Sequence, residues 1–156
     1  MDINFNIQKF IDIDYATDKR KARRKGGKQS TQEFFSPYSI VKRMADKIHD
    51  EDWQNPSKTF LDPCCGNGNL IIAILYRRIV EHGIDWKTAL ENCYGVELMQ
   101  DNVDETKERI IDLLNKLSIE YDKDVAYEIM NRNIVCSDFF KWNFEEWRPY
   151  TEDELK

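Results

Sequence analysis

The sequence has 156 residues, of which 41% are hydrophobic and 33% charged, and its formal net charge is −6. That apolar content is enough for one modest core, so we expect a single domain, or part of a larger one, and exclude a chain that is disordered throughout. The longest apolar run, residues 70–76, is far shorter than the roughly 20 residues of a membrane helix, and the N-terminus lacks the pattern of a signal peptide. These features predict a cytoplasmic protein.

The first 30 residues are predicted to form an N-terminal arm followed by a basic loop. Phe5, Phe10 and Ile13 follow no sustained period, which indicates a short arm that docks through its aromatic side chains. The loop contains Gly26 and Gly27, and it has seven basic residues without an acidic one: Lys19, Arg20, Lys21, Arg23, Arg24, Lys25 and Lys28. Such a cluster can bind the phosphates of a nucleic acid, or it can be merely a solubilising loop.

Residues 31–142 show the alternation of helices and strands that is typical of an α/β domain. Ser36 as N-cap and Pro37 in the first turn predict a helix over about 37–49. Strands are predicted over 59–62, 94–97 and 134–136, and helices over 69–81, 85–92 and 101–117, with one or two further helical turns in 122–132. This order predicts a parallel sheet of about three strands with right-handed crossovers and flanking helices, a partial Rossmann-like fold. Residues 143–156 are predicted to be an acidic C-terminal tail.

Two of these helices have apolar residues at helical spacing, which predicts one buried face for each. In the first helix the face consists of Ile40, Val41, Met44, Ala45 and Ile48. In the helix over 101–117 it consists of Val103, Ile110, Leu113, Leu114 and Leu117.

A carboxylate follows or ends each predicted strand: Asp62, Glu97 and Asp138. In open parallel sheets, ligands bind beyond the carboxyl ends of the strands. The loop from Asp62 to Gly68 has two glycines within three residues, which lets the backbone approach a ligand closely. No Lys-Ser/Thr pair follows the second glycine, and Ile71 occupies the place of a third glycine, so neither a Walker loop nor a complete dinucleotide fingerprint is present.

The charges around this loop indicate what kind of ligand it can hold. Asp62 would repel a phosphate but attract an ammonium group. Glu97 is placed to accept hydrogen bonds from the two hydroxyls of a ribose. We therefore expect a ligand that has a ribose, an adenine and an ammonium group but no phosphate.

A metal site is not expected. The four cysteines, Cys64, Cys65, Cys93 and Cys136, have no CxxC spacing, and neither of the two histidines stands at a ligand-like interval from them. They are interpreted as small, buried thiols.

Residues 62–70, DPCCGNGNL, resemble the DPxxGxGxL cofactor motif of S-adenosylmethionine-dependent DNA methyltransferases that modify the exocyclic amine of adenine. Residues 32–37, QEFFSP, together with the apolar residues after them, are similar to the QFFTPxxIVxxM segment of the same family, with serine in place of threonine. Gly95-Val96-Glu97 resembles the acidic motif of its second strand, and residues 137–140, SDFF, its third-strand GDFF motif. Four motifs thus occur in the order of the adenine-specific branch.

The resemblance implies S-adenosylmethionine as cofactor and assigns a role to each matching position. The turn formed by Phe35, Ser36 and Pro37 is expected to close over the methionine end of the cofactor. The loop with Asp62, Pro63, Cys64, Gly66 and Gly68 is expected to hold the amino-acid portion. Glu97, followed by Leu98, is expected at the ribose, and Asp138 and Phe139 at the edge and face of the adenine.

The family's catalytic motif, (Asp/Asn/Ser)-Pro-Pro-(aromatic), does not occur in this sequence. The four prolines are Pro37, Pro56, Pro63 and Pro149, and no two are adjacent. Arg148-Pro149-Tyr150 cannot replace the motif, because an arginine has no acceptor for the hydrogens of an amine. No catalytic residue is therefore assigned, and the chain alone is expected to be inactive.

Two functional hypotheses remain. The chain is either the cofactor-binding portion of an adenine-specific DNA methyltransferase, active only with a missing catalytic part, or an inactive cofactor- or DNA-binding module that senses, competes or counters restriction. The resemblance also places the strand over 59–62 in the middle of the complete sheet, so its edge is left open here. We expect DNA as a partner, and a second polypeptide, self-association or a local rearrangement at that edge, in a bacterial or phage-infected cell.

Overall fold

The computed structural model describes residues 5–13 and 35–156. The predicted basic loop, with its seven candidate nucleic-acid contacts, lies outside the described residues. None of the described helices is both long and apolar enough to cross a membrane.

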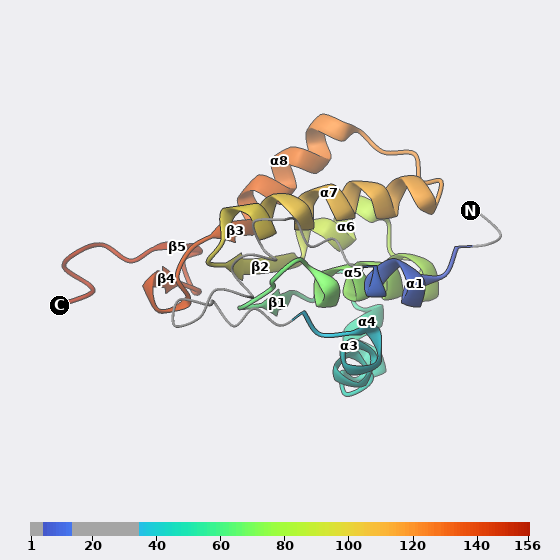
Figure 1. Ribbon diagram of the computed structural model, residues 1–156, viewed down its shortest axis with the longest axis horizontal. Helices are drawn as coiled ribbons and strands as arrows, with labels where there is room; N and C mark the ends of the chain where they lie inside the picture. Colours follow the sequence, from blue (N-terminus) through green and yellow to red (C-terminus); the bar gives the residue numbers. More distant parts are fainter. Residues whose placement is uncertain (1–4, 14–34) are drawn as a thin grey trace.

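The centre of the fold is a parallel sheet of three strands, β1 (Phe60–Asp62), β2 (Cys93–Glu97) and β3 (Ile134–Cys136), in the order β1-β2-β3 (Figure 1). The predicted α/β class and the parallel sheet of three strands with flanking helices are confirmed. Because all three strands point the same way, their carboxyl ends meet at one edge of the sheet.

One face of the sheet is buried and the other is only partly covered. The register places Phe60, Cys93 and Ile134 on the same face, and all three are buried. On the opposite face, Leu61 lies beside Tyr94 and is 44% exposed. The sheet is therefore packed mainly from one side.

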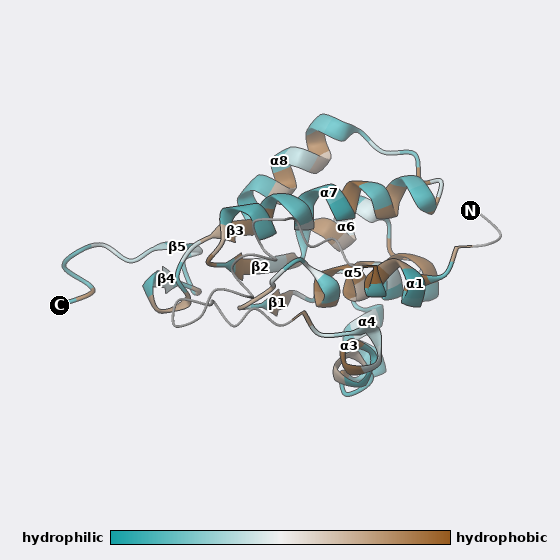
Figure 2. Cartoon of the chain, viewed as in Figure 1, coloured by the Kyte–Doolittle hydropathy of each residue, from teal (hydrophilic) through white to brown (hydrophobic). Residues whose placement is uncertain are grey.

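The long helices form the cover of the buried face. α5 (Asn69–Tyr76) contacts β1 and β2, and α7 (Gln100–Lys116) contacts β2 and β3. α6 (Trp86–Glu91) and α8 (Lys123–Asn133) pack against each other. The five residues predicted to face inward from the long helix, Val103, Ile110, Leu113, Leu114 and Leu117, are all buried. Figure 2 shows the same division, with hydrophobic strands inside and hydrophilic residues on the outer side of α7 and α8.

The helix predicted over 69–81 is divided in two. After α5 the chain continues as a single π-helical turn, η2 (Arg77–Glu81). This turn carries Arg78, whose guanidinium is buried and donates to the carbonyl oxygens of Asn55, Pro56 and Lys58. A π-helical turn contains one residue more than an α-helical turn, and here it occurs where the Arg78 side chain faces inward.

The predicted helix over 37–49 is shorter than expected. α3 (Tyr38–Ala45) ends early, and a separate helix, α4 (Asp50–Gln54), follows. Ser36 is not the N-cap: Pro37 occupies that position without a side-chain cap, and the carboxylate of Asp12 accepts from the Tyr38 N–H at 2.8 Å. The predicted buried face is also only half right, because Val41 and Ala45 are buried whereas Ile40 and Met44 are 41% and 47% exposed.

The two ends of the described chain pack onto this core. α1 (Ile7–Asp12) buries Phe10 and Ile11, and Phe5 contacts the ring of Tyr76, so the arm does dock through aromatic side chains, although Ile13 is exposed. Beyond β3, η3 (Phe139–Lys141) leads to a two-stranded hairpin of β4 (Trp142–Asn143) and β5 (Arg148–Pro149). Trp147, inside the segment predicted as a tail, packs against Tyr94 and donates to the Arg132 carbonyl.

Candidate functional site at the carboxyl ends of the strands

Glu97 is at the centre of the candidate site, where β2 ends. Its Oε2 accepts a hydrogen bond from the Gly66 N–H at 2.9 Å, and its Oε1 accepts one from the Met99 N–H at 2.9 Å. The Asn102 amide reaches Oε1 at 3.4 Å. A carboxylate has about four acceptor positions, so Oε2 can still accept from a hydroxyl. Glu97 therefore both holds the glycine loop and faces the space in front of it.

That space is a hollow of about 170 Å³ beyond β1, β2 and β3. Six residues predicted from the sequence line it: Pro63, Cys64, Glu97, Leu98, Asp138 and Phe139. Val96 and Ser137 complete the wall. Most of its surface is apolar, with carboxylates on two sides, which suits a flat heterocycle joined to a hydroxylated sugar.

The glycine loop between β1 and α5 has two residues in the left-handed backbone region. Gly66 has φ +54° and Gly68 has φ +87°. A Cβ on Gly68 would lie 2.6 Å from the Thr106 Cγ2, and one on Gly66 would lie 3.0 Å from the Phe35 ring. Gly68 therefore requires glycine for conformation and for space, whereas at Gly66 the backbone conformation favours glycine and a side chain would have to displace the Phe35 ring.

Asp62 ends β1 beneath this loop and is mostly shielded from water. Burial raises the pKa of its carboxyl, and the charge of Glu97 raises it further, while a hydrogen bond from the Cys64 N–H opposes the shift. A cation placed beside Asp62 would favour its ionised form, and so would offset both the free-energy cost of burying the charge and the repulsion from Glu97. The pair of carboxylates thus favours a ligand that brings a positive charge.

The turn predicted to close over the site lies against the glycine loop. Phe35 is the nearest neighbour of Gly66, and the Ser36 carbonyl accepts from the Asn69 amide at 2.8 Å. Pro37 is exposed and begins α3. Phe35, Ser36 and Pro37 are not part of the wall of the hollow, so the structure brings them to the loop and not to the space that the strands enclose.

Asp138 and Phe139 form the far wall of the hollow, after β3. The Asp138 carboxylate caps η3 by accepting from the Phe140 N–H at 3.0 Å through Oδ1, and Oδ2 has no hydrogen-bond partner among the described residues. Phe139 is 41% exposed, although its ring contacts those of Phe140 and Phe144, so it offers an aromatic surface to the hollow.

A set of buried polar residues beneath the loop was missed from the sequence. Thr106 Oγ1 lies 2.9 Å from the Asn102 carbonyl oxygen and 3.2 Å from the Gly66 carbonyl oxygen, so its one hydrogen is shared between them. Arg109 donates to the Asn67 carbonyl at 2.7 Å and to Asn69 Oδ1 at 2.6 Å. Asn102, Thr106 and Arg109 recur at helical spacing and belong to the stripe that also contains Val103, Ile110 and Leu113. Polar residues inside an apolar stripe were the signal that could have identified them.

The thiols near the site are protonated at neutral pH. Burial raises the pKa of Cys93 to about 12, and it raises the pKa of Cys65 as well. Cys64 and Cys136 are exposed, contrary to the prediction that all four cysteines are buried. Within residues 5–13 and 35–156, no three metal-ligating side chains gather in one place.

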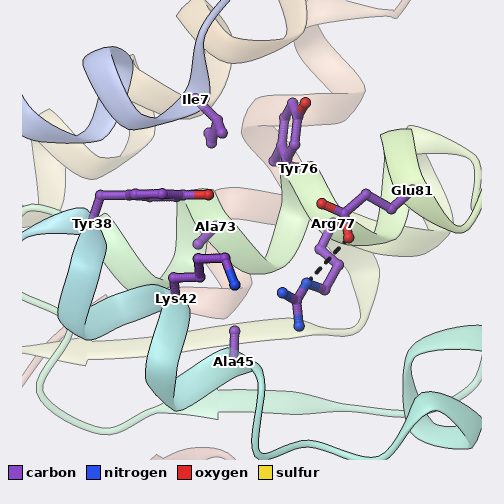
Figure 3. A pocket seen from close by; sticks show the side chains of 8 residues that line it. All are labelled: Ile7, Tyr38, Lys42, Ala45, Ala73, Tyr76, Arg77 and Glu81. Atoms are coloured by element: carbon purple, nitrogen blue, oxygen red, sulfur yellow. Dashed lines mark ion pairs between the residues drawn. The ribbon is translucent and has the colours of Figure 1, made fainter.

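A smaller hollow lies between α1, α3 and α5, and Figure 3 shows the side chains around it. Its volume of about 20 Å³ is enough for one water molecule. Its two cations are already paired, Lys42 with Asp46 and Arg77 with Asp46 and Glu81. This hollow is therefore not a ligand site.

The model of one protein family, described as N-6 DNA methylase, matches residues 18–111, which is more than half of the chain. The chain belongs to the N-6 DNA methylase family. The matched residues include the glycine loop, Glu97 and most of α7, so the family's sequence pattern covers two of the three strand ends. No curated protein and no solved structure matches the chain.

The part of the chain that matches the N-6 DNA methylase family includes the turn at 35–37, the glycine loop and β2. DNA methylation is the function that this family indicates. Asp138 and Phe139 lie beyond the matched residues, and the structure brings them to the same hollow as Glu97.

Proposed function

We propose that this chain binds S-adenosylmethionine at the carboxyl ends of β1, β2 and β3 and serves as the cofactor-binding portion of an adenine-specific DNA methyltransferase. The observation that carries this proposal is Glu97, whose carboxylate is oriented by two backbone N–H groups at the rim of an apolar hollow. A preoriented acceptor beside an apolar slot is the arrangement that binds a nucleoside.

The residues present fit this cofactor in charge and in shape. Leu98, Pro63 and Phe139 offer apolar contacts to an adenine, and Asp138 Oδ2 can accept from its amine. Glu97 can accept from the ribose hydroxyls, and Asp62 can attract the ammonium group. When bound, S-adenosylmethionine supplies an electrophilic methyl group on a positively charged sulfur.

The chain's own contribution to methyl transfer is binding and orientation. Holding the donor fixed removes much of the entropy barrier for attack by an amine nitrogen. In the complete reaction a C–N bond forms as the S–C bond breaks, and the amine loses a proton. The group that accepts the amine hydrogens belongs to the Pro-Pro motif, which this sequence lacks. We therefore propose that the chain transfers a methyl group only when another segment or polypeptide supplies that motif.

Calorimetry tests the cofactor claim. The wild type should bind S-adenosylmethionine, and Glu97→Gln should weaken binding at least about tenfold, because it replaces a charged acceptor with a neutral one. Glu120→Ala, an exposed change far from the strand ends, is the control and should bind normally. Failure of the wild type to bind would show that the proposed function is wrong.

A methyl-transfer assay tests the second half of the claim. The chain alone should transfer no methyl group to adenine in DNA, although it binds the donor. Transfer by the unaided chain would contradict the conclusion drawn from the missing motif. If the chain is instead an inactive module that senses or competes with active methyltransferases, both assays should give the same results. The two hypotheses are separated by adding a chain that carries the Pro-Pro motif, which should restore activity only to a cofactor-binding portion.

We also propose that a second polypeptide or a second copy covers β1. Among the described residues β1 pairs only with β2, which leaves the other edge of this strand open. Beside the edge lies an apolar groove of about 320 Å³, whose lining includes Met44, Ile48, Phe60, Leu61, Leu70 and Ile74. Natural proteins rarely leave such an edge uncovered. We place this assembly in the cytoplasm, where it meets DNA.

A further inference from the structure

Arg109 is a fully buried cation directly beneath the glycine loop. It belongs to α7, and its side chain is 1% exposed. One nitrogen of its guanidinium, Nη1, donates to the Asn67 carbonyl at 2.7 Å and to Asn69 Oδ1 at 2.6 Å. Both distances are those of strong, charge-assisted hydrogen bonds.

The other end of the same guanidinium faces the N-terminal helix. Nη2 lies 3.4 Å from the Phe10 carbonyl and 3.5 Å from the Ile11 carbonyl, and the guanidinium carbon lies 5.8 Å from the centre of the Phe10 ring. These are longer contacts, but they are made to the last turn of α1, where carbonyl groups lack partners within the helix. α1 is thereby held by the same side chain that holds the glycine loop.

Asn69 extends this contact to a third segment. While its Oδ1 accepts from Arg109, its Nδ2 donates to the Ser36 carbonyl at 2.8 Å. Asn69 opens α5 immediately after Gly68, so the amide connects the loop to the turn at 35–37. Three segments that are far apart in the sequence, α1, the turn at 35–37 and the loop at 62–68, meet through two side chains.

We infer that Arg109, acting with Asn69, is a positioning residue that couples the cofactor loop to the docking of α1. This inference rests on the proposed function, because it treats the loop as the part that holds the donor. A buried guanidinium cannot lose its charge, so it must keep its acceptors. When the loop shifts, the acceptors at Asn67 and Asn69 move, and the contacts to α1 are rearranged with them. Ligand binding at the loop and docking of α1 therefore stabilise each other.

Arg78 offers a matched control. It is also fully buried, and its guanidinium also donates to backbone carbonyl oxygens, those of Asn55, Pro56 and Lys58. These acceptors precede β1, at the end of the sheet opposite to the candidate site. Substitution of either arginine should lower the stability of the fold. Only substitution of Arg109 should also remove the coupling between the loop and α1.

The test is hydrogen exchange on the wild type and on Arg109→Lys, Asn69→Ala and Arg78→Lys. Without ligand, Arg109→Lys should speed exchange at least tenfold both in the loop amides of Cys65 and Gly68 and in α1, whereas Arg78→Lys should speed it around residues 55–58. Asn69→Ala leaves Arg109 in place and should loosen the loop and the turn at 35–37. It also keeps the inference testable if Arg109→Lys does not fold.

Adding S-adenosylmethionine supplies the second measurement. In the wild type and in Arg78→Lys the ligand should slow exchange in α1, which does not line the hollow, and in Arg109→Lys this remote protection should disappear while binding weakens about tenfold. Changes in the loop without changes in α1, or remote protection that survives Arg109→Lys, would overturn the inference. Failure of the wild type to bind the ligand would instead overturn the proposed function, and the exchange measured without ligand would still decide the role of Arg109.

Discussion

At the scale of single residues, side chains of the candidate site bind the protein backbone and also face the space proposed for the ligand. Glu97 accepts from two backbone N–H groups and still has acceptor capacity toward the hollow. Asp62 is the opposite case, because it gains only one hydrogen bond and lies in a buried, negatively charged position. A residue that destabilises its own fold in this way is typical of a binding site.

Asp62→Asn tests that interpretation. The folded-state pKa of Asp62 is raised above its ordinary value of 3.8, so its ionised form destabilises the fold. This destabilisation is absent below the unfolded pKa, grows as pH rises from the unfolded to the folded pKa, and stays constant above the folded pKa. The asparagine variant should therefore gain stability relative to the wild type as pH rises, measured by thermal melting. It should also bind S-adenosylmethionine about tenfold more weakly, because the attraction for an ammonium group is lost.

Thiol labelling gives an independent residue-level prediction. At neutral pH a thiol reagent should modify Cys64 and Cys136 and leave Cys65 and Cys93 unreacted, because burial raises the pKa of all four thiols but only Cys64 and Cys136 are exposed to the reagent. Cys64 lines the hollow and Cys136 does not. S-adenosylmethionine should therefore slow labelling of Cys64 severalfold, as measured by mass spectrometry. Equal protection of Cys136 would indicate a general tightening of the fold instead of contact with the ligand.

At the scale of elements, the turn from β1 to α5 depends on its neighbour α7. Gly68 begins α5 in the left-handed region, and Thr106 on α7 fills the space where a side chain would be. Thr106 and Arg109 then present hydrogen-bonding groups to the loop, and Asn102 on the same stripe of the helix reaches the Glu97 carboxylate that holds the loop. α7 is therefore the support of the loop as well as a cover for the sheet.

Gly68→Ala should unfold at clearly lower urea concentration than the wild type. We expect a loss of about 3 kcal/mol, from left-handed strain together with the clash against Thr106. Gly83→Ala is the control, since Gly83 also has a positive φ, +67°, but has nothing within 4 Å of the added carbon. That variant should lose only about 1 kcal/mol, from the backbone strain alone. Equal losses at the two positions would show that Thr106 does not constrain the loop.

At the scale of the whole molecule, the sheet is packed mainly on one face, and no other strand of residues 5–13 and 35–156 pairs with the outer edge of β1. Ile40, Met44 and Leu61 are all more than 40% exposed, and Met44 and Leu61 line the same groove. An apolar surface of this kind beside an unpaired strand edge indicates an interface.

Sedimentation of the wild type should show association that increases with concentration. Leu61→Lys should abolish the association, because it places a charge in the apolar groove beside the open edge. It should leave the melting temperature nearly unchanged, since the side chain is already 44% exposed. Leu155→Lys is the matched control at a similarly exposed leucine, 49%, near the C-terminus. If the wild type stays monomeric throughout, self-association is wrong, and a second polypeptide or a local rearrangement remains to cover the edge.

The strands and the inward face of α7 were predicted from the sequence more accurately than the face of α3. The strands over 59–62, 94–97 and 134–136 and the inward face of α7 were correct, because apolar runs and helical spacing are local patterns. The face predicted for α3 was wrong at Ile40 and Met44. Periodicity states which residues share a side of a helix, but not whether another element covers that side.

The sequence by itself determined that this is an α/β chain with a glycine loop between strand and helix and with carboxylates at its strand ends, since residue type and spacing carry that information. Only the tertiary structure decided that Glu97 binds the loop backbone and that Arg109 joins the loop to α1. These features depend on contacts between residues 31 to 99 positions apart, and the local pattern of a sequence does not record such distances.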